Sequence, residues 1–313
     1  MSTVAETYKA RDVEEVIDIW FYRRVGYRLA LAAKYLKLKP NLITVIGITI
    51  GVIAGHFFFY NTLALNAIGM GLWVISNIFD SADGQLARMT GQTSQLGRIL
   101  DGLGGSVVFA SMYFHISFHY ALNDGVIGWW IFIVALAAGA SHSLQSAMAD
   151  YYRNAFLRFG VKGGKSELER ASAVIERYNQ LTWRRNFFTK LFYKVYVNHT
   201  VQQETFSPKF QLMRDTLEVR YGNKLPDAIV SRYRSLNRPL LKYYNYLTIN
   251  GRVLTLFAFV AIGYPTLFFI VELTLMNLTL WAVLRKQEKN NQEITRMAEL
   301  EGDKTFSLSE AVA

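Results

Sequence analysis

The stretch that decides the fold reads Asp80-Ser81-Ala82-Asp83-Gly84-Gln85-Leu86-Ala87-Arg88 and continues to Gly97 and Asp101. It lies where one long apolar segment ends and the next begins. Carboxylates at a membrane boundary are costly unless they bind something, and a metal ion is the usual ligand. The stretch therefore indicates a functional site at the edge of a membrane bundle.

The spacing of this stretch predicts a single functional face on each of two helices. At 100° per residue, one face of the first helix carries Asp80, Asp83, Gly84, Ala87 and Arg88. In the next segment Gly97, Asp101 and Gly105 recur every fourth residue and form one stripe. We therefore expect three carboxylates to face each other across a short loop.

These residue types suit a nucleotide diphosphate. Oxygen ligands from several carboxylates are typical of Mg²⁺, Mn²⁺ or Ca²⁺ sites. Gly84 and Ala87 lack bulk, so a flat base or a pyrophosphate can approach the backbone. Arg88 can neutralise phosphate through forked hydrogen bonds. A simple helix cap is the alternative reading, and it explains one aspartate but not the whole pattern.

The composition predicts a membrane protein with substantial parts in water. Of the 313 residues, 51% are apolar, and the mean hydropathy is +0.14. The absence of cysteine excludes disulfides and thiolate chemistry. The first forty residues lack the apolar core of a cleavable signal peptide. The net charge of +10 favours anionic membrane lipid as a partner, rather than nucleic acid, because apolar spans accompany it.

The predicted fold class is an all-α membrane protein with six transmembrane helices. The spans are expected at 41–60, 62–80, 96–120, 126–149, 248–264 and 266–284. An amphipathic helix at 12–36 is expected to lie in the membrane interface, with packing on a soluble core as the alternative. None of the 34 Lys and Arg lies in the short turns near Asn61, Asp124 and Tyr264. The positive-inside rule then places the termini and the acidic site on the cytoplasmic side of the inner membrane.

Five segments follow from these spans. They are an N-terminal cytoplasmic segment (1–40), four spans with the acidic motif (41–156), a cytoplasmic helical insert (157–245), two further spans (246–284) and a tail (285–313). In the insert, Ser166 and Glu169 predict a capping box. Interleaved aromatic and basic residues there favour a helix on anionic headgroups, although a nucleic-acid face has a similar pattern.

The motif resembles that of the CDP-alcohol phosphotransferases, also called CDP-alcohol phosphatidyltransferases. Their signature is D-x2-D-G-x2-A-R-x8-G-x3-D-x3-D, and this chain matches it from Asp80 to Asp101. Pro40-Asn41-Leu42-Ile43-Thr44 stands where the family often has P-N-x2-T. The resemblance implies an enzyme of phospholipid head-group synthesis. It implies transfer of a substituted phosphate from a CDP-linked donor to an alcohol, with release of CMP.

The resemblance also implies roles for individual residues. Two divalent cations, Mg²⁺ or Mn²⁺, would be ligated by Asp80, Asp83 and Asp101. The CDP moiety would be held by Gly84, Ala87, Arg88 and Gly97, and the nucleotide phosphates contacted by Asn41 and Thr44. A homodimer is implied as well. We expect a donor of the CDP-diacylglycerol type and a polyol or polyol phosphate acceptor, although a CDP-polyol donor with a lipid alcohol acceptor is chemically equivalent.

One position departs from the signature. Gly105 stands where the family has the aspartate that is taken as the base for the acceptor hydroxyl. General-base catalysis contributes about 10²–10⁴-fold, so its loss slows transfer without abolishing metal or nucleotide binding. Four explanations remain open: a substitute base such as Asp150, proton transfer to the acceptor's own phosphate, a pseudoenzyme that binds CDP-lipid or scaffolds lipid synthesis, or an inactivated variant. For Asp150, a simple helix-end charge is the alternative. Glu272, in the sixth predicted span, is a candidate to pair with Arg252.

Overall fold

The computed structural model describes residues 13, 15–92, 95–162, 166, 168–222 and 224–310, with the side chains of 95–96, 98–99, 101–103, 127 and 301–310 left out. The described residues form helices and turns and contain no strand, as expected for an all-α protein. They divide into two compact units. The first unit is Met1–Ser143 with Ile249–Met276, and the second is Leu144–Thr248 with Asn277–Ala313.

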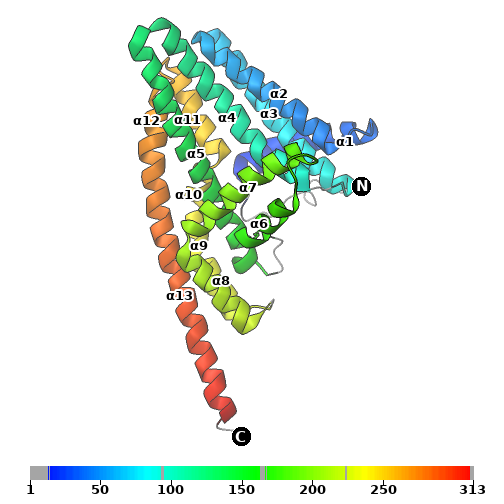
Figure 1. Ribbon diagram of the computed structural model, residues 1–313, viewed down its shortest axis with the longest axis vertical. Coiled ribbons are helices and arrows are strands. Elements are labelled where there is room, and N and C mark those ends of the chain that lie inside the picture. Colours follow the sequence, from blue (N-terminus) through cyan, green and yellow to red (C-terminus); the bar gives the residue numbers. More distant parts are fainter. Residues whose placement is uncertain are drawn as a thin grey trace. The chain divides into compact units, whose positions relative to one another are not determined.

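The first unit contains the following elements, labelled in Figure 1 where there is room: η2 (Asp18–Tyr22), α1 (Arg23–Tyr35), α2 (Pro40–Phe57), η3 (Phe58–Tyr60), α3 (Leu63–Thr90), α4 (Gln95–Asn123), the first part of α5 (Gly125–Gly160), α11 (Ile249–Ala261), α12 (Leu267–Val271) and η5 (Glu272–Met276). The second unit contains the rest of α5, followed by α6 (Ala171–Gln180), α7 (Phe187–Thr205), α8 (Pro208–Tyr221), α9 (Asp227–Asn237), η4 (Arg238–Leu240), α10 (Leu241–Tyr246) and α13 (Asn277–Glu310).

Helices α2 and α3 form the hairpin that carries the motif. Pro40 occupies the first turn of α2, where its missing N–H has no partner to lose. The hairpin turns at Asn61, which adopts a left-handed conformation with a φ of 47°. Helix α3 ends at Gly91, whose φ of 68° carries no steric penalty in glycine. These local signals place the end of α3 beside the start of α2.

Among the residues that the structure describes, four helical segments are long and apolar enough to cross a membrane. They are Pro40–Tyr60, Leu63–Thr90, Gly128–Gly160 and Leu267–Leu300, which correspond to four of the six predicted spans. Helix α4 has 29 residues. Helix α11 has 13 residues and is therefore about 20 Å long, shorter than a ~30 Å hydrocarbon core. The four segments are consistent with an integral membrane protein, whereas the count of six spans stays a prediction.

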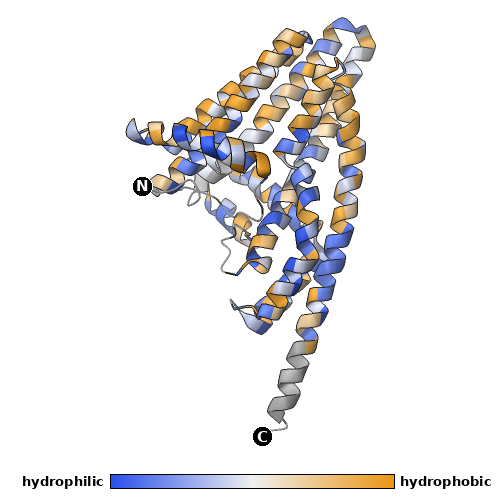
Figure 2. Ribbon diagram, turned by 180° about the vertical axis from the view of Figure 1, so that it is seen from behind, coloured by the Kyte–Doolittle hydropathy of each residue, from blue (hydrophilic) through white to orange (hydrophobic). Residues whose placement is uncertain are grey.

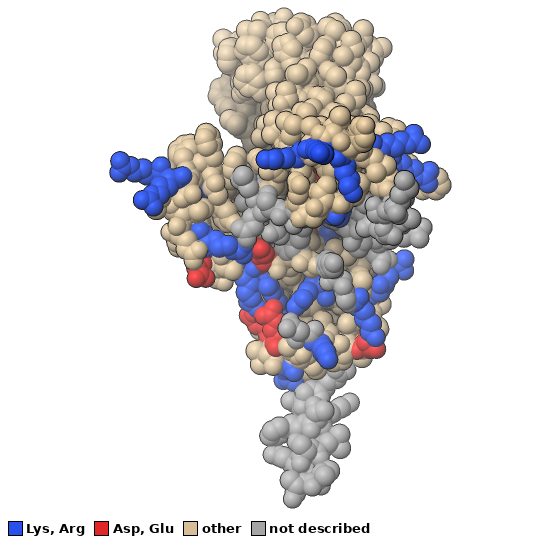
Figure 3. All heavy atoms as spheres, turned by 90° about the vertical axis from the view of Figure 1, so that its right-hand side faces the viewer, with Lys and Arg blue, Asp and Glu red and all other residues tan. Residues whose placement is uncertain are grey.

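The polarity of these helices changes along their length. Figure 2 shows α13 mostly hydrophobic near its start and mostly hydrophilic further along. The helix extends from Asn277 to Glu310, so most of the tail predicted beyond 285 is helical. On the face drawn in Figure 3, the end of the first unit where α4 turns into α5 shows neither Lys nor Arg. The sequence predicted this end to lie on the outer side of the membrane because its short turns contain no Lys or Arg.

A glycine stripe lets the helices of the first unit approach closely. Gly47, Gly51 and Gly55 recur every fourth residue on α2 and face α3 and α4. Ser76 of α3 donates its hydroxyl hydrogen to the Gly47 carbonyl at 2.7 Å. A Cβ on Gly55 would lie 2.5 Å from Ser111 Oγ of α4. Small residues at such spacing are the usual means by which membrane helices pack backbone against backbone.

Replacing Gly51 by Ala is expected to destabilise this packing. The added Cβ would collide with Val108 and would lie 2.7 Å from Ser76 Oγ. Overpacking of this kind costs about 1–3 kcal/mol, and thermal unfolding in detergent micelles measures it. Gly71→Ala is the matched control, because nothing lies within 4 Å of a Cβ there. Equal unfolding temperatures for the two variants would contradict the packing role of the stripe.

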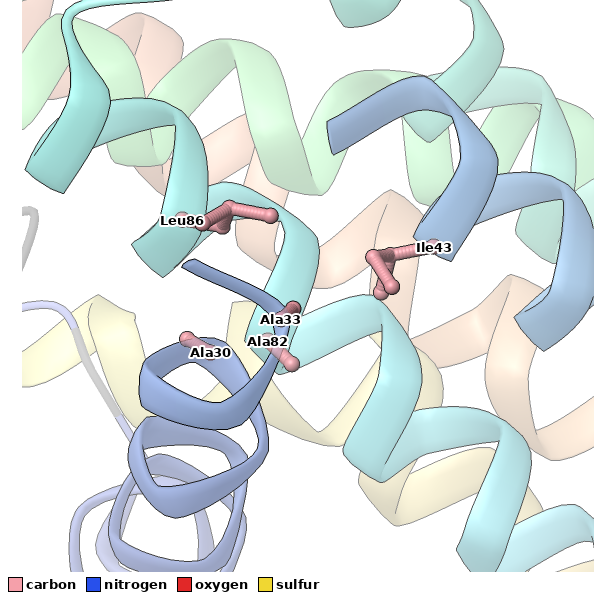
Figure 4. Close-up of a cluster of buried hydrophobic side chains, with 5 residues drawn as sticks. All are labelled: Ala30, Ala33, Ile43, Ala82 and Leu86. Carbon is pink, nitrogen blue, oxygen red and sulfur yellow. The ribbon is translucent and has the colours of Figure 1, made fainter. Parts of the chain in front are cut away.

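Helix α1 covers the side of α3 that carries no motif residue. Figure 4 shows the buried cluster that joins them, which consists of Ala30, Ala33, Ile43, Ala82 and Leu86. The Gln85 side-chain amide of α3 donates a hydrogen bond to the Arg23 carbonyl at 3.0 Å. This packing leaves the opposite side of α3 for the motif.

The N-terminal helix differs in part from the amphipathic helix predicted at 12–36. It begins with a π-helical turn, Asp18–Tyr22, and continues as α1 to Tyr35, whereas residues 12 and 14 lie outside the description. Val16 and Trp20 are well exposed, while Val13 is buried. A helix packed wholly on a soluble core would bury such side chains, so the exposure favours the interface. The interfacial location stays a prediction.

A buried polar cluster joins four elements of the first unit. Arg252 of α11 pairs with Glu272 of η5 at 3.4 Å, and both side chains are fully buried. The predicted pairing is therefore confirmed. Tyr113 of α4 donates to Glu272 Oε2 at 3.3 Å and hydrogen-bonds His142 Nδ1 of α5 at 3.2 Å. Breaking a buried pair leaves an uncompensated charge, so these contacts fix how the four elements meet.

The second unit is held by polar contacts to α13. Arg232 of α9 pairs with Glu293, and Arg220 of α8 donates to the carbonyl of Ala298 at 3.0 Å. Tyr152 of α5 donates to Glu288 at 3.0 Å. The polar half of α13 is therefore a structural part of this unit.

The predicted capping box in the insert is wrong. Helix α6 begins at Ala171, beyond both residues of the proposed box. Ser166 instead donates to the Asn154 carbonyl at 2.9 Å, and Glu169 pairs with Arg177 at 2.8 Å. Tertiary contacts of these side chains replace the local cap.

Candidate active site

The last three turns of α3 present the motif on one side. Asp80 is exposed, whereas Asp83 is 3% exposed, and Gly84, Ala87 and Arg88 are partly exposed. All five lie in a continuous helix, as their spacing predicted. Helix α1 packs against the other side of α3, and on the motif side Asp80 is the most exposed of the five residues.

Gly84 and Arg88 lie together one turn apart. A Cβ built on Gly84 would be 3.5 Å from both Nη1 and Nη2 of Arg88, which is ordinary van der Waals contact. The packing of the chain itself therefore does not require glycine at position 84. A guanidinium over an open stretch of backbone suits a phosphate or a flat base that approaches the helix closely.

The start of α2 lies beside this part of α3. A Cβ on Gly47 would be 3.7 Å from the backbone nitrogen of Asp80. Asn41, in the first turn of α2, is exposed. Thr44 is buried, and its hydroxyl donates to the Pro40 carbonyl at 3.2 Å. Asn41 is therefore accessible to a ligand, whereas the Thr44 hydroxyl would first have to leave this helical bond.

Helix α4 carries the second half of the motif. Gly97, Asp101 and Gly105 lie in one continuous helix, as predicted, and the side chain of Asp101 is outside the description. Among the described residues, a Cβ on Gly105 would meet Ile249 Cδ1 at 3.6 Å, which is ordinary van der Waals contact. The described neighbours of position 105 therefore admit a Cβ.

The aspartates provide the ligand type that a hard divalent cation requires. Asp80 and Asp83 are three residues apart on α3, so their carboxylates are neighbours on the helix surface. Among the side chains that are described, no group of three or more His, Cys, Asp and Glu is placed to hold a metal ion. Asp101, the third predicted ligand, does not belong to that set. The ligand set fits Mg²⁺ or Mn²⁺ in chemistry, and its assignment stays a prediction.

Asp150 belongs to the second unit and is described there. It is exposed on α5, and Asn154 donates to its carboxylate at 3.2 Å. Burial lowers the pKa of nearby His199 of α7, and the charge of Asp150 acts in the opposite direction. The role of Asp150 as a substitute base stays a prediction.

Sequence reasoning missed the small residues that position the motif helix. The stripe Gly47, Gly51 and Gly55 was detectable from its spacing of four residues. Gly26 of α1 was not, because only the fold shows that a Cβ there would lie 3.0 Å from the Ser81 side chain. Both features support the site without contacting a ligand.

The comparisons concern the part of the chain that carries the candidate spans and the aspartate-glycine-arginine face of α3. Residues 37–158 match the family model of the CDP-alcohol phosphatidyltransferases. The match includes α2, α3, α4 and nearly all of α5. The family indicates an enzyme, a CDP-alcohol phosphotransferase, that acts in phospholipid head-group synthesis and is generally dependent on divalent metal ions.

Two curated proteins are each similar to less than half of the chain. An archaetidylinositol phosphate synthase from Pyrococcus horikoshii is 28% identical over 138 residues, which is 44% of this chain and 67% of the relative. A bifunctional IPC transferase and DIPP synthase from Thermococcus kodakarensis is 30% identical over 130 residues, which is 40% of this chain and 27% of the relative. The chain thus spans about a quarter of the second protein.

Proposed function

We propose that this protein transfers a substituted phosphate from a CDP-linked lipid of the CDP-diacylglycerol type to a polyol or polyol phosphate, with release of CMP. The observation that carries the proposal is that Asp80, Asp83, Gly84 and Arg88 lie together on one side of α3. The family match supports the reaction class. The name of the Pyrococcus relative, an archaetidylinositol phosphate synthase, favours a polyol phosphate as acceptor.

In this proposal the residues of α3 bind and orient the CDP moiety. Arg88 donates forked hydrogen bonds to phosphate oxygens, and Gly84 lets the nucleotide approach the backbone. Asp80, Asp83 and Asp101 would hold two divalent cations, Mg²⁺ or Mn²⁺, which when bound neutralise the charge of the pyrophosphate and of the leaving CMP. The bond that breaks joins the lipid-bearing phosphorus to the bridging oxygen of CDP. The new bond joins the same phosphorus to the acceptor oxygen.

The acceptor hydroxyl also has to lose its proton. Gly105 offers no group for this step, so the proton leaves to another base, such as Asp150, or to the phosphate of a polyol phosphate acceptor. The second route agrees with the acceptor favoured above. It needs no residue beyond those that bind the substrates.

The proposal places the site on the cytoplasmic side of the membrane. The absence of Lys and Arg from the three short turns supports this orientation. The five segments, the six spans and the homodimer stay predictions, and the proposed reaction does not depend on them.

Incubation with a panel of donors tests the proposal. Purified protein in lipid nanodiscs with Mn²⁺ receives CDP-diacylglycerol or a CDP-polyol, each with its matching acceptor. We expect CMP and a new phospholipid, identified by mass spectrometry, with CDP-diacylglycerol and a polyol phosphate. CMP release from the CDP-polyol with a lipid alcohol, but not from CDP-diacylglycerol, would overturn the donor assignment. Binding of CDP without CMP release from any donor would support a pseudoenzyme.

A further inference from the structure

Helix α7 exposes several large apolar side chains along one side. Its exposed large hydrophobic side chains are Phe187, Phe188, Leu191, Val195 and Val201. They follow one another at spacings of three, four and six residues after the first pair, so they form one stripe about 21 Å long at ~1.5 Å per residue. The buried side contains Tyr193, Thr200 and Gln203. Water disfavours this arrangement, so the stripe indicates a partner.

Basic residues accompany the stripe. Residues 178–203 contain four basic side chains, Arg184, Arg185, Lys190 and Lys194, and no Asp or Glu. Lys190 lies over the Tyr178 ring, 4.6 Å from its centroid, and donates to the Leu181 carbonyl, which holds α7 against α6. The other three are exposed. Apolar and aromatic side chains flanked by Lys and Arg are typical of helices that lie in an anionic membrane surface.

A hydrogen bond from the buried side of α7 joins this helix to a candidate membrane span. Gln203 donates a hydrogen bond to the Ala147 carbonyl of α5 at 2.9 Å, within the second unit. Ala147 belongs to the candidate membrane span Gly128–Gly160 and lies two residues before the predicted end of the fourth span at 149. The end of α7 therefore contacts α5 where that helix is expected to leave the bilayer.

We propose that the stripe Phe187, Phe188, Leu191, Val195 and Val201 lies in the anionic lipid surface of the membrane and anchors the second unit there. Phe188, which is 72% exposed, reaches the boundary between headgroups and acyl chains. Arg184 and Arg185 contact lipid phosphates. The occupant is a bilayer rather than a second copy of the chain, because the stripe is accompanied by charge of one sign and Gln203 of α7 bonds to a candidate membrane span.

Spin-label accessibility tests this proposal in the full-length protein. The native chain has no cysteine, so Phe188→Cys and Val195→Cys each provide a single labelling site. In nanodiscs of phosphatidylglycerol and phosphatidylcholine, we expect both labels to collide readily with oxygen and poorly with a water-soluble nickel chelate. Val219→Cys on α8, which is 86% exposed, is the control and should show the opposite preference.

Two further comparisons separate the lipid surface from other partners. Replacing phosphatidylglycerol by phosphatidylcholine should raise the nickel accessibility of the label at Phe188→Cys. When Arg184→Gln and Arg185→Gln are added to this variant, the two lipid compositions should give the same nickel accessibility. Nickel accessibility equal to that of the Val219→Cys control would overturn the proposal. Low accessibility to both reagents, or a dipolar distance between labels on two chains, would assign the stripe to a protein contact instead.

Discussion

Replacing Asp83 by Asn is expected to lower CMP release about 10³-fold, since loss of a metal ligand removes several kcal/mol of charge stabilisation. Asp83 is 3% exposed in the last turns of α3, and Asn has the same shape, so the fold should be preserved. Initial rates at saturating Mn²⁺ measure the effect. Higher Mn²⁺ concentrations should restore part of the activity if the loss lies in metal affinity.

Binding of Mn²⁺ and CDP to the Asp83→Asn variant is measured separately from the reaction rate. Ligands that bind the folded state raise its unfolding temperature, so Mn²⁺ with CDP should stabilise the native protein and stabilise Asp83→Asn less. Asp124→Asn is the matched control, because Asp124 is an exposed aspartate in the turn before α5, remote in sequence from the motif. Identical metal-dependent stabilisation of Asp83→Asn and the native protein would disprove the ligand assignment.

Replacing Gly105 by Asp is expected to raise turnover about 10²–10⁴-fold, the usual contribution of a general base, if no other group already takes the proton. The described neighbours admit a Cβ at position 105, because it would lie 3.6 Å from Ile249 Cδ1, in ordinary van der Waals contact. Position 105 also lies one turn after Asp101 on α4, which is the spacing of the family signature. Single-turnover CMP release measures the proton-transfer step separately from product release.

Gly105→Asn is the control for this experiment. It adds nearly the same volume without a basic carboxylate, so its turnover should stay at the native level. The pH dependence of the Gly105→Asp variant should gain a rise with the ionisation of the new carboxylate. Unchanged or reduced turnover in Gly105→Asp would show that another group already takes the proton, and Asp150→Asn would then be the next variant to measure.

The sequence predicted the motif face correctly because a helical period needs only local spacing. It placed the end of the second span at residue 80, whereas α3 continues to Thr90. The charged residues ended the apolar run that defined the span. The helix continues because Ala82 and Leu86, on its other side, pack against α1. Hydropathy alone does not contain that contact.

The remaining differences have similar causes. Helix α11 ends at Ala261, three residues before the predicted bound of 264, and Gly263 follows with a φ of 82° in the turn near Tyr264. The capping box failed because Ser166 and Glu169 bond to partners that the fold brings near. For the site, sequence spacing placed the residues on α3 and α4. The geometry between the two carboxylate-bearing faces stays a prediction, since it depends on the Asp101 side chain.

Metal-dependent binding of CDP is the most direct test of the central claim that the binding half of the site, Asp80 to Asp101, is intact. Calorimetric titration of the native protein in nanodiscs measures the binding of CDP, first with Mn²⁺ present and then after the ion has been removed by a chelator. The account predicts saturable binding that requires the ion and weakens in Arg88→Lys, because Lys lacks the forked donors of Arg. Absence of binding, or equal binding after chelation, would contradict it.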